Sequence, residues 1–135
     1  MTANFSLITH AAQRHADELL KAGQIVIFAG GTGCPFFSTD TAAALRAAQI
    51  KADMLLLAKD VDGVYDKDPK CNGDACKFDE LTYGELLSRG LHATDLTAIT
   101  LCKECSLELI VFDLNDPQNI VRAAEGEKLG TRIHR

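Results

Sequence analysis

The stretch Gln24-Ile25-Val26-Ile27-Phe28-Ala29, which runs into Gly30-Gly31-Thr32-Gly33, gives the first indication of the fold class. Its apolar run shows little alternation with polar residues, which is typical of a strand covered on both faces in a parallel sheet. We therefore predict a strand over residues 24–29 that lies centrally in such a sheet. An alanine-rich helix, predicted over residues 40–50, follows the glycine-rich turn and can pack closely on the sheet.

Strands and helices alternate along the rest of the chain. An amphipathic helix is predicted from Leu7 to Ala22, with Gly23 in the position of a C-cap. Because strands separated by helices connect through right-handed crossovers, we expect a three-layer α/β/α fold with a mainly parallel sheet. The other predicted elements are a strand at 54–58, a helix at 82–87 with a Thr82–Glu85 capping box, a helix from Thr94 or Asp95 to about Cys105, a strand at 109–114, a helix at 118–125 and an edge strand at 131–133.

Size and charge exclude several classes of function. The 135 residues, 47% of them hydrophobic, suffice for one buried core, so residues 1–135 are predicted to form a single domain. The net charge of -5 leaves no general basic field to hold a nucleic-acid polymer. No apolar run approaches the roughly 20 residues of a membrane-spanning helix, and residues 1–6 lack the pattern of a secretory leader. We expect a soluble, cytoplasmic protein.

The five cysteines allow one alternative that involves a metal. Cys102 and Cys105 form a C-x-x-C pair, and with Cys71 and Cys76 upstream four thiolates could bind zinc. The sequence around Cys102 favours a helix over a zinc-knuckle turn, so we predict reduced thiols and no metal site.

The loop between the first strand and the alanine-rich helix is a candidate phosphate site. Its glycines permit positive φ angles, and Ser38 and Thr39 bring hydroxyl and N–H groups to a helix N-terminus, where an anion is favoured. The same residues also suit an ordinary glycine turn followed by a helix cap. The bare pattern leaves both interpretations open.

A longer string of residues resembles one family closely. The segment Gly31-Thr32-Gly33-Cys34-Pro35-Phe36-Phe37-Ser38-Thr39-Asp40 and the helix after it are similar to the signature of bacterial uridylate kinases, in the amino acid kinase family. The resemblance continues through residues 61–69, Tyr83, residues 95–98 and residues 126–131, and so covers nearly the whole chain. It implies transfer of a phosphoryl group from ATP to UMP, with Mg²⁺ as the cofactor.

The resemblance also implies where UMP binds. Thr32 and Cys34 would meet the uracil edge, Thr39 the phosphate, and Phe36 and Phe37 would form walls of the pocket unless they pack in the core. The family usually has Asn in place of Cys34, and a thiol is a weaker donor and acceptor than a carboxamide. The complete UMP segment is Thr32, Gly33, Cys34, Pro35, Phe36, Phe37, Ser38 and Thr39.

For catalysis the resemblance points to Asp40, which would orient positive groups on the moving phosphoryl group; a helix-capping Asp is the alternative. It places ATP at Lys59, Tyr65 and Asp68, where the ring of Tyr65 offers a stacking surface. Asp95 suits either a helix cap or the active site.

Family members also carry a Lys-x-Ser-Gly phosphate loop and a glycine-triplet loop with an Arg, ahead of the part that matches this chain. The resemblance therefore implies that the chain is the C-terminal, nucleotide-binding half of the fold. Without those cationic groups we expect the chain alone to lack catalysis. The family implies a hexamer. Two alternatives stay open: a nucleotide-binding module without turnover, and another amino acid kinase.

Overall fold

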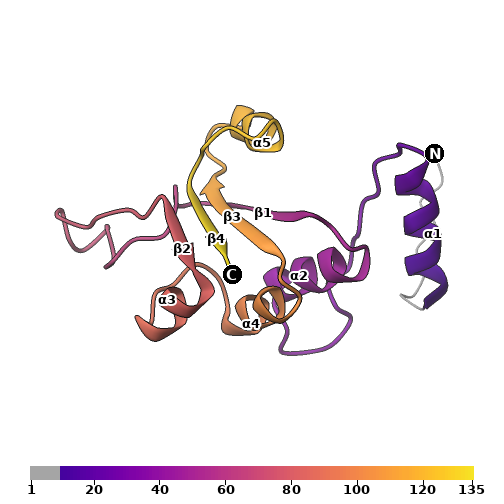
Figure 1. Ribbon diagram of the computed structural model, residues 1–135, viewed down its shortest axis with the longest axis horizontal. Helices are drawn as coiled ribbons and strands as arrows, with labels where there is room; N and C mark the ends of the chain where they lie inside the picture. The colour runs from indigo at the N-terminus through magenta and orange to yellow at the C-terminus, as the bar shows by residue number, and fades with distance from the viewer. Residues whose placement is uncertain (1–9) are drawn as a thin grey trace.

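The protein is described by a computed structural model over residues 10–135. Its strands form one sheet in the order β1-β3-β4-β2 (Figure 1). The elements are α1 His10–Lys21, α2 Thr39–Gln49, β1 Met54–Lys59, β2 Glu80–Thr82, α3 Tyr83–Ser88, α4 Leu96–Glu104, β3 Glu108–Asp113, α5 Gln118–Ala124 and β4 Thr131–His134.

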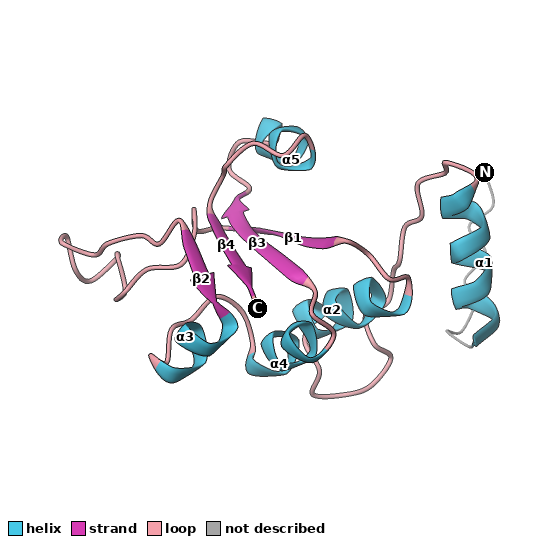
Figure 2. Cartoon of the chain, viewed as in Figure 1, coloured by secondary structure: helices cyan, strands magenta, loops and turns pink. Residues whose placement is uncertain are grey.

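The sheet is mixed and mostly parallel. β1 pairs with β3 and β2 pairs with β4 in parallel ladders, whereas β3 and β4 are antiparallel. Helices α2, α3 and α4 lie on one side of the sheet and α5 lies on the other (Figures 1 and 2). The predicted three-layer α/β fold is confirmed.

Each face of the sheet has its own hydrophobic core, because alternate residues of a strand point to opposite faces. Leu109 and Val111 of β3 belong to the larger core, under α2, α3 and α4. Ile110 and Phe112 belong to the smaller core, under Ala123 of α5. β3 is therefore covered on both faces, as its apolar sequence predicts.

Side-chain caps fix where three helices begin. Ser38 accepts a hydrogen bond from the Thr41 N–H and starts α2, and Asp95 accepts one from the Ala98 N–H and starts α4. The predicted capping box at α3 is confirmed, because the side chains of Thr82 and Glu85 each accept a hydrogen bond from the other's backbone N–H.

The prediction of a central strand over residues 24–29 is wrong for this structure. The segment forms no strand, and its side chains are largely in solvent, with Ile25 93% and Ile27 87% exposed. A strand exists only with a ladder partner for its N–H and C=O groups. No backbone hydrogen bond within the described residues joins residues 25–29 to another segment.

The prediction of an edge strand at residues 131–133 is also wrong, because β4 lies between β3 and β2. In the structure Arg132 forms a double contact with the Glu108 carboxylate at 2.8 and 3.1 Å, so a charged residue is accommodated inside the sheet. The short strand β2 was not predicted, since three residues carry too little pattern.

Helix α1 lies to one side of the sheet (Figure 1). The amide of Gln13 donates to the carbonyl of Gln49 at 2.6 Å, and Gly23 ends the helical region at a φ of 75°. Leu7 and Ile8, included in the predicted helix, lie outside the described residues. Within residues 10–135, none of the helices combines the length and hydropathy that crossing a membrane requires.

Candidate active site

Asp40 lies where three elements meet. It stands in the first turn of α2, where its Oδ2 accepts hydrogen bonds from the ammonium of Lys59, at the end of β1, and from the hydroxyl of Thr94, just before α4. The side chains of Lys59 and Asp40 are only 25% and 22% exposed, so solvent screens this ion pair less than a pair on the surface. The first candidate loop ends at Asp40 and the second begins at Lys59, so the pair connects the two loops.

Asp95, next to Thr94 in the sequence, connects the starts of α2 and α4. Its carboxylate accepts hydrogen bonds from the hydroxyls of Ser38 and Thr41, in the latter case at 3.1 and 3.2 Å. The Ala98 N–H donates to it at 2.7 Å, so Asp95 is the cap of α4. It therefore joins the N-termini of α2 and α4, and the sequence did not reveal this second contact.

Hydrogen bonding controls the charge of Asp95. Burial by itself raises the pKa of Asp95, but hydrogen bonds from Ser38, the Ala98 N–H and Thr41 favour the ionised form and hold the pKa below its usual value. Near neutral pH the site thus contains a carboxylate at Asp95. We refer to Ser38, Asp40, Lys59, Thr94 and Asp95 as the carboxylate cluster.

The alternative role of Asp40 as a helix cap is wrong, because Ser38 is the N-cap of α2. Within residues 10–135 Asp40 accepts no capping bond from its own helix, and its side chain contacts Lys59 and Thr94. Its catalytic role stays a prediction. The sequence indicated Thr94 only as a possible helix cap. Its hydrogen bond to Asp40 joins residues 54 positions apart, so no local pattern could predict it.

The predicted UMP segment is an exposed loop. Thr32 shapes it locally, since its hydroxyl accepts from the Cys34 N–H at 3.1 Å. Phe36, with a φ of 71°, is fully exposed and Phe37 is 53% exposed, so the alternative of core packing is wrong for both. Whether they form the walls of a nucleotide pocket stays a prediction. Gly33, Cys34 and Pro35 of the same loop are exposed, as is Thr39, the first residue of α2.

Arg46 secures the start of this loop from α2. Its guanidinium donates to the carbonyl of Gly31 at 3.3 Å and to the side chain of Gln49 at 2.6 Å. Arg46 is only 7% exposed, and its Nε has no hydrogen-bond partner among the described residues. A buried cation thus lies directly behind the glycine turn.

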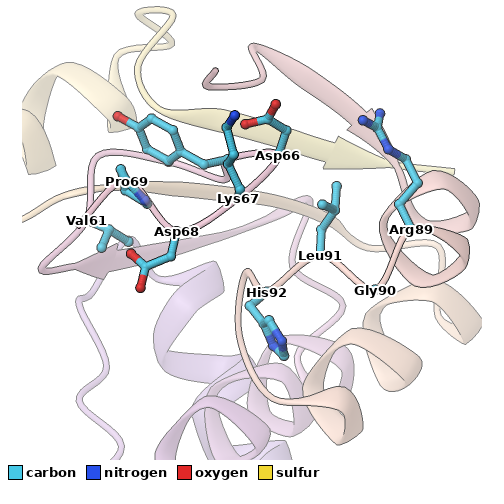
Figure 3. A pocket seen from close by; sticks show the side chains of 11 residues that line it. Val61, Asp66, Lys67, Asp68, Pro69, Arg89, Gly90, Leu91 and His92 are labelled. Carbon is cyan, nitrogen blue, oxygen red and sulfur yellow. The ribbon is translucent and has the colours of Figure 1, made fainter. Parts of the chain in front are cut away.

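The second loop borders a cavity of about 390 Å³. Tyr65 and Asp68, both predicted to bind ATP, are among the residues that line it. The opposite wall comes from the turn after α3, where Leu91 and His92 lie across the cavity from Asp68 (Figure 3). Sequence reasoning missed this wall, because only the fold brings the two loops together. Lys59, the third predicted ATP residue, lies instead at the carboxylate cluster.

Tyr65 lies between two hollows. Besides the first cavity it borders a second one of about 350 Å³, which Asp113 and Asn115 close from the end of β3. Its hydroxyl donates to the Asp62 carboxylate at 2.7 Å, and this hydrogen bond raises the pKa of Tyr65. The hydrogen bond holds the hydroxyl end of the ring in place between the two cavities.

Thr131 of β4 anchors the second loop to the sheet. Its buried hydroxyl accepts from the Val64 N–H at 2.8 Å and donates to the carbonyl of Phe78 at 2.5 Å. At Gly63 an added Cβ would lie 2.6 Å from that hydroxyl, so the loop can approach only with glycine there. One buried hydroxyl of β4 thus contacts both arms of the second loop.

The C-x-x-C pair lies on a helix, as predicted. Cys102 is buried in α4 and Cys105 is its C-cap, exposed to solvent. Cys71 and Cys76 are exposed in the second loop.

Comparisons with known proteins agree on one family. Residues 2–113 match the amino acid kinase family. The chain is 36% identical to the UMP kinase from Bacillus anthracis, with a TM-score of 0.85 over 90% of this chain and 50% of that protein. The UMP kinase from Ureaplasma parvum gives 37% identity and a TM-score of 0.84 over 91% and 53%. The uridylate kinase from Archaeoglobus fulgidus gives 38% identity and a TM-score of 0.72 over 88% of this chain and 56% of that protein. The chain thus spans about half the length of these proteins.

Proposed function

The chain belongs to the amino acid kinase family, and on that premise we propose that it is the nucleotide-binding half of a kinase that transfers the γ-phosphoryl group of ATP to UMP. The reaction yields ADP and UDP. The observation that carries the proposal is the contact of Asp40 with Lys59, since it brings the end of one candidate nucleotide loop against the start of the other.

Each loop suits one nucleotide in this scheme. UMP lies on the loop from Thr32 to Thr39, where the N-terminus of α2 favours its phosphate. ATP lies with its adenine near Tyr65 and Asp68, in the cavity that His92 closes from the other side. The phosphates of both nucleotides then meet at the carboxylate cluster, which lies between the two loops.

Phosphoryl transfer depends on positions and charges more than on covalent chemistry. In our proposal Lys59 contributes positive charge beside the transferred group, and the carboxylate of Asp40 sets the direction of its ammonium. Thr94 holds the same carboxylate from a third side. Asp95 fixes Ser38, so the UMP loop enters α2 in one orientation.

Magnesium suits this arrangement. Within residues 10–135 the contacts of the Asp40 carboxylate with Lys59 and Thr94 are both made by Oδ2, so Oδ1 could serve as an oxygen ligand. When bound, the ion supplies charge neutralisation between phosphate oxygens. Asp40 would hold it together with the phosphates, since Mg²⁺ usually takes only one or two carboxylates from a protein.

Because the chain spans about half the length of the UMP kinases it resembles, we propose that activity needs the other half of the fold. The chain alone then binds nucleotides without turnover. From the resemblance we also propose a cytoplasmic hexamer for the complete protein, which light scattering and cell fractionation can test.

The test is a coupled assay of ADP release with Mg²⁺, ATP and UMP. We expect no release from the chain alone and UMP-dependent release once both halves are present. In the two-half protein, replacing Asp40 with Asn should lower kcat at least about 100-fold, as the loss of an oriented electrostatic group does in other enzymes. Asp53→Asn changes an exposed carboxylate beyond α2 and should leave kcat unchanged.

Other outcomes would count against the proposal in different ways. Nucleotide binding without ADP release in the two-half protein would favour a binding module. Turnover with another acceptor while UMP is inert would favour a different amino acid kinase. An Asp40→Asn variant with normal kcat would exclude the role given to that carboxylate.

A further inference from the structure

Two exposed thiols flank a tight turn in the second loop. Cys71 and Cys76 are both free and exposed, and residues 72–75 separate them. The N–H of Ala75 donates to the carbonyl of Asn72 at 3.1 Å, so the chain reverses between the two cysteines. The ends of such a turn lie within about 7 Å of each other, and each cysteine is the next residue outward. A disulfide joins Cα atoms about 4.4–6.8 Å apart, so closing one here requires little movement of the chain.

Hydrogen bonds hold each cysteine on its own arm of the loop. The N–H of Asp66 donates to the carbonyl of Cys76 at 3.0 Å, and the Asp66 carboxylate accepts from the Cys76 N–H at 2.8 Å. On the other arm the N–H of Cys71 donates to the carbonyl of Asp68 at 3.2 Å, and the thiol donates to the Asp68 carboxylate at 3.5 Å. The two thiols therefore belong to opposite arms of one closed loop.

The other three cysteines lack this arrangement. Cys102 is buried in α4, and burial raises the pKa of its thiol, which makes it a poor partner for Cys105. Cys34 lies in the first loop, where residues 30–39 contain no second cysteine. Among the five cysteines, only Cys71 and Cys76 combine exposure of both thiols with a turn between them.

We propose that Cys71 and Cys76 form a reversible oxidation site, at which hydrogen peroxide converts the two thiols into a disulfide within the chain. The sulfur of Cys76 attacks one peroxide oxygen, which gives a sulfenic acid and releases a first water. The sulfur of Cys71 then attacks the sulfenic sulfur, forms the S–S bond and expels a second water. The two thiols lose two electrons, the peroxide gains them, and both thiol protons leave in the water molecules.

The order of the two steps follows from the surroundings of Cys71. Its hydrogen bond to the Asp68 carboxylate raises the pKa of the Cys71 thiol, and the thiolate is the reactive form. We therefore assign the first attack to Cys76 and the second to Cys71.

The site adjoins the larger cavity of the second loop. Asp68 and Pro69, just before Cys71 in the sequence, line that cavity (Figure 3). Oxidation removes the thiol proton that Cys71 donates to Asp68, so this carboxylate loses a hydrogen-bond donor. Exposed disulfides are the ones that form and are reduced readily, which suits regulation more than stability. The proposal concerns the thiols alone and does not depend on the proposed reaction.

The test uses the full chain, first reduced and then treated with a small excess of hydrogen peroxide in the absence of nucleotide. Trypsin cleaves after Lys70 and Lys77, so both cysteines appear in one peptide, residues 71–77. After iodoacetamide has blocked the remaining thiols, mass spectrometry should find this peptide unalkylated and lighter than its dithiol form by two hydrogen atoms. The dithiol form should fall at least tenfold, and dithiothreitol should restore it.

Cys71→Ser separates the disulfide from other oxidation, because serine keeps a donor for Asp68 but cannot form an S–S bond. In this variant peroxide should leave a sulfenic acid at Cys76, which dimedone traps. Cys105→Ser is the matched control, since it also removes an exposed thiol but lies at the C-cap of α4. It should form the disulfide at the rate of the wild type.

Three results would overturn the proposal. The first is a peptide 71–77 that stays in its dithiol form after peroxide treatment. The second is a disulfide that joins Cys71 or Cys76 to Cys34 or to another chain, seen as a cross-linked peptide pair. The third is oxidation of the two sulfurs that dithiothreitol does not reverse.

Discussion

Thr131→Val tests how far one hydroxyl positions the second loop. Valine keeps the shape of threonine but cannot hydrogen-bond, and the site is completely buried. The change leaves the Val64 N–H without its acceptor and the Phe78 carbonyl without its donor. The first group is fully buried and the second only partly, so unsatisfied groups should cost about 1–3 and about 1 kcal/mol respectively.

We therefore expect the free energy of unfolding to fall by about 2–4 kcal/mol, measured by urea denaturation with circular dichroism. Thr131→Ser is the control, because it keeps the hydroxyl and should lose only about 1 kcal/mol for the methyl group. Amide exchange at Val64 should accelerate in the valine variant alone. The reasoning is refuted if Thr131→Val is as stable as the wild type, or if the serine variant is destabilised equally.

Three further outcomes follow from local geometry. Gly130→Ala should lower the free energy of unfolding by more than about 4 kcal/mol, because its Cβ would lie 1.9 Å from the Val111 carbonyl oxygen. Gly126 also has a positive φ but has open space around it, so Gly126→Ala should lower it by only about 1–2 kcal/mol. Thermal denaturation of both variants measures the difference. Asp95 has a lowered pKa in the folded state, so it stabilises the protein above its unfolded pKa of about 3.9, and this contribution is lost as the pH falls through the lower folded value. Asp95→Asn should remove that part of the acid sensitivity in denaturation curves at successive pH values, and an unchanged pH profile would contradict the assignment. Ser38→Ala should lose about 1 kcal/mol with the cap of α2, and stability equal to the wild type would show that another group caps the helix.

Elements that depend on their own sequence were predictable. The capping box at Thr82 and Glu85 and the cap at Asp95 act within a few residues of chain, so a local pattern is enough to find them. The strands β1 and β3 were found because their apolar runs are long enough to indicate burial. The family resemblance likewise rested on contiguous strings.

Features that depend on a partner were not predictable from pattern. Residues 24–29 have the composition of a strand, but whether they become one depends on a neighbour. The sequence of β4 alone does not show that the carboxylate of Glu108, on the neighbouring strand, accommodates Arg132 inside the sheet. In the site, Thr94 and His92 became visible only when the fold brought them to Asp40 and to the cavity.

The connection between α2 and β1 is short, running only from Ile50 to Asp53. Because α2 carries Asp40 at its start and β1 carries Lys59 at its end, the spacing between the two loops is set by a rigid helix, a tight bend and a strand. Residues added to that bend would rotate or shift α2 relative to the sheet and so separate the side chains of Asp40 and Lys59. Residues 70–74 hydrogen-bond to Lys67 and Asp68 of the same loop, so we expect added residues there to leave the spacing of Asp40 and Lys59 unchanged.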